Sequence, residues 1–184
     1  MSDQYFFIFN ISIISLFQIY LIISYFRKNI KGKAFENLLI YAVVLPFLLY
    51  EHFSELNIRS FILTCSLLTV IGHSFVGTYL NFYFKSKTYD RYLHLFGAFS
   101  FALLAFSILN HIIPFMNESW VYTFLLVTTL GITIGVLFEI AEFTHDSFSK
   151  KMKCQHGLTD TDFDLIFNVF GSAIAGLLSI FIFL

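Results

Sequence analysis

The sequence predicts an all-α, polytopic membrane helix bundle with six transmembrane helices and with both termini outside the cytoplasm. Three observations predict it: too little charge for a soluble domain, six long apolar stretches, and basic loops that alternate along the chain. Only 12% of the 184 residues are charged, and 58% are hydrophobic. Because a soluble domain carries about twice that share of charge, the bilayer must solvate part of this protein's surface.

Each of the six stretches approaches the roughly 20 apolar residues that a span needs. They run from about Tyr5 to Phe26, Phe35 to Tyr50, Phe61 to Phe84, Tyr92 to Phe115, Trp120 to Ile140 and Leu165 to Leu184. The second has a short apolar core and contains Pro46, so a re-entrant or interfacial segment is the alternative there. The fifth is expected to continue as helix beyond the lipid. Together they form one predicted transmembrane domain, residues 1–184.

The basic residues are unevenly distributed among the loops. Ten of the 11 Lys and Arg residues occupy the first, third and fifth predicted loops: Arg27, Lys28, Lys31, Lys33, Lys85, Lys87, Arg91, Lys150, Lys151 and Lys153. Since cytoplasmic loops are enriched in Lys and Arg, these three loops are predicted to be cytoplasmic. The protein is therefore predicted to be a multi-pass protein of the cell membrane with lipid as its partner. Its net charge of −1 gives no attraction to nucleic acid.

Ionisable and polar residues gather at the cytoplasmic ends of three predicted helices. Asp90 and His94 begin the fourth helix, and Glu139, Glu142, His145 and Asp146 end the fifth. Asp160, Asp162, Asp164 and Asn168 lie at the start of the sixth. Because ionisable residues at membrane depth are costly, they usually face the bundle interior and mark function.

Helical spacing predicts that these residues meet. At about 100° per residue, each helix carries its polar and small residues on one side. The three sets are Asp90, His94 and Gly97; Gly131, Gly135, Glu139, Glu142 and His145; and Asp164, Asn168, Gly171 and Ala175. Small residues four apart let membrane helices approach closely. The three polar faces are therefore expected to converge.

Several carboxylates in one place need a proton or a cation between them. The sequence thus predicts a divalent metal ion as cofactor, Mg²⁺ or Mn²⁺ from the carboxylates and Zn²⁺ or Fe²⁺ if an imidazole joins. The predicted metal ligands are Asp90, His94, Glu142, His145 and Asp164, and the predicted catalytic residues are Glu139, Glu142, Asp164 and Asn168. Glu142 and His145 also match the Glu-x-x-His spacing of carboxylate metal helices.

Structural roles are the alternatives for several of these residues. Asp90, and either Asp162 or Asp164, could cap their helices. Glu142 could pair with Lys150 or Lys151. His73, deep in the third helix, could join the cluster, or it could be a core histidine bonded to a nearby carbonyl.

Three segments together resemble the YjdF-like family of bacterial inner-membrane proteins and, more loosely, the VanZ-like group of small membrane proteins. The segments are Tyr89–His94 (YDRYLH) followed by Gly97, Phe138–Phe143 (FEIAEF), and Asp160–Asp164 (DTDFD) followed by Asn168 and Gly171. The resemblance extends from about His73 to Gly176. It implies a bacterial inner-membrane protein and supplies no substrate.

Three functions follow from these observations. The first is a metal-assisted enzyme that acts on a lipid headgroup or polyprenyl-type substrate at the cytoplasmic interface. The second is a transporter or channel for protons or a metal ion, which needs polar groups along the whole path. The third is a non-catalytic membrane subunit or effector whose carboxylates lock the helices together.

Overall fold

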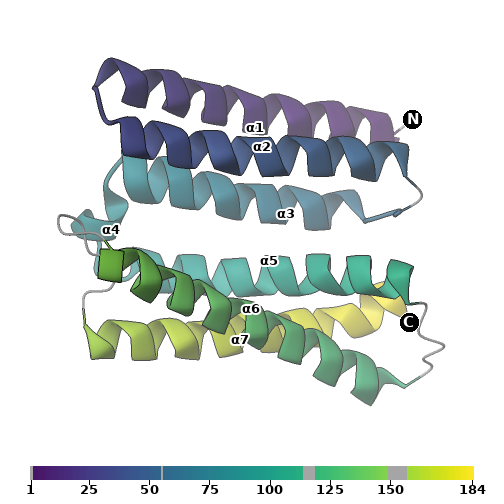
Figure 1. Cartoon of the computed structure of the whole chain (residues 1–184). Helices are drawn as coiled ribbons and strands as arrows, with labels where there is room; N and C mark the ends of the chain where they lie inside the picture. The colour runs from purple at the N-terminus through teal and green to yellow at the C-terminus, as the bar shows by residue number, and fades with distance from the viewer. Residues whose placement is uncertain (1, 55, 114–118, 149–156) are drawn as a thin grey trace. The chain divides into compact units, whose positions relative to one another are not determined.

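The computed structural model describes residues 2–54, 56–113, 119–148 and 157–184, and every regular element in these ranges is a helix. The chain divides into two compact units, Met1–Lys85 and Ser86–Leu184, each with three long helices (Figure 1). Six helices are long and apolar enough to cross a membrane. The predicted helical membrane fold is thereby confirmed.

The first unit contains α1 (Ser2–Arg27), α2 (Lys31–Phe53), α3 (Ser60–Ile71), η1 (Gly72–Tyr79) and α4 (Phe82–Lys85). Helix α1 packs against α2, α3 and η1. Helix α2 is 23 residues long and continues through Pro46, so it is long and apolar enough to span a membrane.

The third predicted span is not one regular helix. After Ile71 the backbone widens into the π-helix η1, and the chain then turns at Asn81, whose φ is 65°. This left-handed conformation is one that Asn tolerates better than most residues. The turn brings α4 back so that the Tyr83 ring lies against Gly77, where a Cβ would overlap it. The predicted continuous helix to Phe84 is therefore wrong beyond Tyr79.

The second unit contains α5 (Tyr89–Ile112), α6 (Trp120–Phe148) and α7 (Leu158–Phe183), and each of these helices packs against the other two. Helix α6 continues past Ile140, as expected. Helix α7 begins seven residues before the expected Leu165, because Gly157 adopts a φ of 128° that favours glycine and starts the helix there. Asp160, Asp162 and Asp164 thus lie within α7.

Two glycines allow the helices of the second unit to approach closely. A Cβ at Gly171 of α7 would overlap the backbone oxygen of Leu95 on α5. A Cβ at Gly135 of α6 would lie 2.6 Å from Cγ of Asn168 on α7. Because neither position has room for a larger residue, the three helices meet directly beside the polar residues at one end of the unit.

Candidate functional site

The polar faces predicted from helical spacing are buried in the second unit. On α6, Gly131, Gly135 and Glu139 are buried and Glu142 is half-buried. On α7, Asp164 and Asn168 each expose 2% of their surface. Both faces turn toward α5, where Gly97 is buried as well.

His94 lies at the centre of this polar cluster. Its Nε2 is 3.5 Å from Oε1 of Glu139, 3.6 Å from Oδ1 of Asp90 and 4.0 Å from Oε1 of Glu142. On the other side of the ring, Nδ1 is 3.3 Å from Oδ1 of Asn168. One imidazole from α5 thus contacts residues from all three helices.

The hydrogen bond to Asn168 determines which ring nitrogen of His94 holds a proton. An amide oxygen can only accept, so Nδ1 donates to Oδ1 of Asn168. In a neutral imidazole, Nε2 then presents a lone pair toward the carboxylates of Asp90 and Glu139. That arrangement requires either a second proton on the ring or a cation between these atoms.

The cluster contains more acidic than basic side chains. Asp90, Glu139, Glu142 and Asp164 supply four carboxylates around one histidine. Arg91 is the neighbouring cation, but its guanidinium lies over the Phe163 ring, 3.9 Å from the centroid. Oδ1 of Asp164 is buried and has no hydrogen-bond partner among the described residues. A buried carboxylate oxygen without a hydrogen-bond partner lowers the stability of the folded protein.

The spacing of the ligand atoms is compatible with a bound ion. The ligand atoms of Asp90, His94 and Asp164 lie within 4.8 Å of one another, and the same holds for His94, Glu139 and Glu142. Ligands of an octahedral Mg²⁺ lie about 2.9 to 4.2 Å apart, as its bond lengths of about 2.1 Å dictate. Small side-chain movements would therefore close either group around a divalent ion.

The site is open on one side. The side chains of Asp90 and Glu142 are 17% and 23% exposed, whereas those of His94 and Glu139 are 9% and 6% exposed. A ligand could reach the first two carboxylates without unfolding a helix. The deeper residues would hold the cation from below.

The simple capping roles are not supported. Helix α7 has Gly157 as its N-cap and α5 has Thr88, and neither makes a side-chain capping bond. Asp162 and Asp164 are therefore not capping residues, and Asp90 lies one residue inside α5. Asp90 and Asp160 are in the first turns of their helices, where a negative charge is still favourable.

His145 is the predicted ligand that the structure does not bring into the cluster. It is exposed on α6 and belongs to neither group of close ligand atoms. Its role as a ligand stays a prediction. Asp146 and the proposed partners Lys150 and Lys151 of Glu142 fall where the structure describes no side chains.

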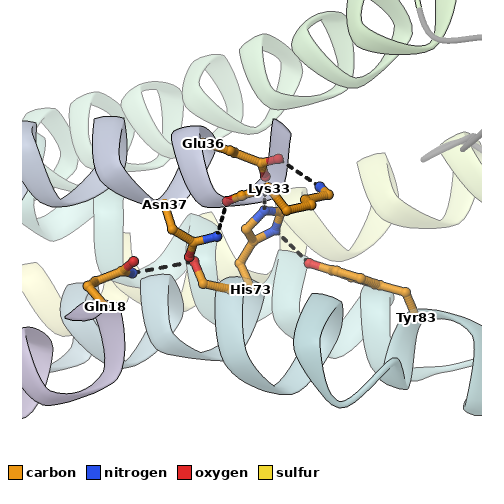
Figure 2. Close-up of polar contacts among 7 residues, drawn as sticks. Gln18, Lys33, Glu36, Asn37, His73 and Tyr83 are labelled. Carbon is orange, nitrogen blue, oxygen red and sulfur yellow. Dashed lines mark hydrogen bonds and ion pairs between the residues drawn. The ribbon is translucent and has the colours of Figure 1, made fainter. Parts of the chain in front are cut away.

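His73 makes its contacts in the first unit. Its Nδ1 is 2.7 Å from the Tyr83 hydroxyl and its Nε2 is 4.0 Å from Oε1 of Glu36 (Figure 2). It is thus bonded to a phenol and not to the carbonyl that was one expectation. The buried amides Gln18 and Asn37 nearby were not among the predicted site residues, because they carry no charge and lie within apolar stretches.

Comparison with known proteins identifies the family and no activity. A family described as "Predicted membrane protein (DUF2238)" matches residues 9–184. An uncharacterised protein of Thermotoga maritima is 40% identical over 103 residues, which are 56% of this chain and 53% of the relative. The chain thus spans about half the length of that relative. No solved structure matches. The chain belongs to the DUF2238 family of predicted membrane proteins.

Proposed function

We propose that the second unit binds a divalent cation at the His94 cluster and uses it in a reaction on a lipid headgroup or polyprenyl-type substrate. The observation that carries this proposal is the position of His94 Nε2, within 3.6 Å of two carboxylate oxygens, beside the buried Oδ1 of Asp164, which has no hydrogen-bond partner among the described residues. A divalent cation would offset the four carboxylates and satisfy these atoms together.

Each residue has a distinct role in this proposal. Asp90, His94 and Asp164 would hold the ion, with Glu142 beside it at the open side. Asn168 would orient the imidazole, as outer hydrogen-bond partners of metal-bound histidines do. Glu139, buried and 3.5 Å from Nε2 of His94, would hold or release a proton as general acid or base. A bound ion would supply Lewis-acid activation of a phosphoryl or carbonyl oxygen.

The position of the site supports a lipid substrate. Asp90 is in the first turn of α5, Asp164 is near the start of α7, and Glu142 is near the end of α6. In a spanning helix these positions lie at headgroup level. We propose that this level is the cytoplasmic one, since the loops between these helix ends carry the basic residues. The YjdF-like and VanZ-like assignments remain predictions.

Lipid conversion in reconstituted vesicles tests the proposal. Purified full-length protein would be placed in vesicles of bacterial lipid extract with Mg²⁺, Mn²⁺ or Zn²⁺, and lipids would be followed by mass spectrometry. We expect one lipid class to be converted, with the rate falling at least about 100-fold on chelation or in Asp164→Asn. Asn168→Leu should lower metal affinity or rate by about 10- to 100-fold.

Asp162→Asn is the matched control, because Asp162 lies two residues from Asp164 but is exposed. It should behave as the wild-type protein does. Unchanged lipids with every metal, from protein that remains folded, would refute the enzymatic proposal. If Asp164→Asn instead failed to fold while chelation had no effect, the carboxylates would have the helix-locking role of a non-catalytic subunit.

A further inference from the structure

The first unit contains a second set of polar side chains, which extends along its helices rather than gathering at one end. Four sets of buried or half-buried polar side chains follow one another along α1 and its neighbours α2, α3 and η1. None of them belongs to the His94 cluster, and the proposed metal site does not explain them.

The first level is a chain of ionisable groups around His73. Lys33 Nζ is 2.7 Å from Oε2 of Glu36, and Oε1 of Glu36 faces His73 Nε2 at 4.0 Å. The Tyr83 hydroxyl is 2.7 Å from Nδ1 on the other side of the ring. Figure 2 shows the imidazole between the carboxylate and the phenol. His73 and Glu36 expose 44% and 36% of their side chains.

This first level lies on an irregular backbone. His73 is the second residue of the π-helix η1, and π-helical turns within membrane or soluble helices frequently occur at functional sites. The return of α4 beneath η1 is what places the Tyr83 hydroxyl on His73. A phenol, an imidazole and a carboxylate in sequence can each accept and release a proton.

The second level consists of the two buried amides. Asn37 Nδ2 donates to the backbone oxygen of Lys33 at 2.8 Å, and Gln18 Nε2 lies 3.5 Å from the Ser74 hydroxyl. Because the Lys33 carbonyl can only accept, the orientation of the Asn37 amide is fixed and its Oδ1 points elsewhere. In the described part of the chain, Oδ1 of Asn37 and Oε1 of Gln18 have no hydrogen-bond partner.

Each of these two buried amide oxygens needs a hydrogen-bond donor. Asn37 is 2% exposed and Gln18 is fully buried, and an amide oxygen without a partner costs about 1 to 3 kcal/mol. Both side chains extend toward the same region between the helices (Figure 2). A water molecule that donates to both oxygens would satisfy them.

The third and fourth levels continue toward the other end of α1. The Tyr41 hydroxyl donates to Ser15 at 3.0 Å, and the Thr64 hydroxyl donates to Oδ1 of Asn10 at 3.0 Å. Beyond Asn10 lies a cavity of about 450 Å³, lined among others by Asn10, Glu51, His52 and Arg59.

The levels are separated by distances that one or two waters can bridge. Ser15 and Gln18 differ by about 4.5 Å of helix rise, and Asn10 and Ser15 by about 7.5 Å. The path from the cavity at Asn10 to Gln18, which lies beside Ser74 and its chain neighbour His73, rises about 12 Å along α1. Ile14, which is fully buried, lies between Asn10 and Gln18 along α1, so the bridging waters would have to pass beside its side chain.

We propose that the first unit holds a proton path from the cavity at Asn10, past Ser15, Gln18 and Asn37, to His73 and Tyr83. Protons fit this path better than metal ions. Glu36, the carboxylate beside His73, is already paired with Lys33, and no described level assembles the several oxygen ligands that a bare cation needs. Hydroxyls, amides and an imidazole can instead pass a proton through bridging waters.

Proton flow into vesicles tests this proposal. Full-length protein would be reconstituted with a pH-sensitive dye inside, and a potassium diffusion potential would drive protons inward. We expect acidification several-fold faster than in protein-free vesicles. Gln18→Leu, which removes the buried amide, and His73→Gln, which removes the titratable ring, should each return the rate to that of protein-free vesicles.

Ser107→Ala is the control, since Ser107 is a buried polar residue of α5 whose hydroxyl donates to the Leu103 oxygen of its own helix at 2.8 Å. It should conduct as the wild-type protein does. If Gln18→Leu does not fold, His73→Gln alone decides the outcome. Wild-type vesicles that acidify no faster than empty ones, or a folded His73→Gln that conducts normally, would overturn the proposal without affecting the metal site.

Discussion

The two units of this protein hold their polar side chains in opposite ways. In the second unit, four carboxylates crowd one histidine at the end of three tightly packed helices. In the first unit, uncharged amides and hydroxyls are spread along the helices, and the ion pair of Lys33 and Glu36 lies near the start of α2. A bound cation would stabilise the crowded carboxylates, whereas water molecules would satisfy the dispersed hydrogen-bonding groups.

The difference also appears in how tightly each unit is packed. Gly171 in the second unit lies against the Leu95 backbone, which cannot move without shifting α5. Gly77 in the first unit lies against the Tyr83 ring, which is a side chain. A rigid site suits a metal of fixed geometry, and a more adaptable one suits groups that exchange protons.

The largest expected effect is on metal-dependent stability, and it should be confined to the second unit. A divalent ion at 100 times its dissociation constant should raise the free energy of unfolding by about 2.7 kcal/mol. Asp164→Asn should lose this gain. Without metal, the variant should be at least as stable as the wild-type protein, because it removes one of the crowded charges.

Thermal unfolding in detergent, with and without chelator, measures this effect. Asp162→Asn should retain the full gain, and His73→Gln should retain it too, since that residue makes its contacts in the first unit. If metal stabilised the wild-type protein and Asp164→Asn equally, any bound metal would lie at another site.

The next effect compares the two glycines. Gly171→Ala should lower the free energy of unfolding by about 2 kcal/mol, within the range of overpacked buried sites. Gly77→Ala should cost less, about 1 kcal/mol, because the Tyr83 ring can rotate away. Chemical denaturation of the two variants checks the ranking. A larger loss for Gly77→Ala would mean that the packing of α4 on η1 is the more rigid of the two.

The smallest effect has the opposite sign. Gln18→Leu should raise the free energy of unfolding by about 1 kcal/mol, since it replaces a buried amide whose oxygen has no protein partner. The same variant should abolish proton flow, so it should be more stable and less active. Thermal unfolding measures the gain, and a clear loss of stability would indicate that the Gln18 amide is fully satisfied.

Much of the second unit could be predicted from the sequence, because its helical periodicity and its charged residues can both be identified there. The offsets of Gly131, Gly135, Glu139 and Glu142 predicted the buried face of α6 correctly. The start of α7 was missed, since it depends on the backbone conformation of Gly157. His145 was expected beside Glu142, yet it is exposed on α6.

The first unit was less predictable for a physical reason. Amides such as Gln18 and Asn37 carry no charge, so nothing in an apolar stretch distinguishes a buried amide from one that faces a loop. The π-helix at His73 and the return of Tyr83 onto it are properties of the backbone around Asn81 and Gly77. Asn10 and Gln18 share a helix face at a spacing of eight residues, which is the one signal that could have indicated them.

The central claim is that the four carboxylates around His94 hold a divalent ion, and elemental analysis of the purified protein tests it most directly. The account predicts about one divalent ion per chain in the wild-type protein and in Asp162→Asn, as one site requires. Asp164→Asn should contain far less. A wild-type protein with no more bound metal than Asp164→Asn, after purification without chelator, would contradict the claim.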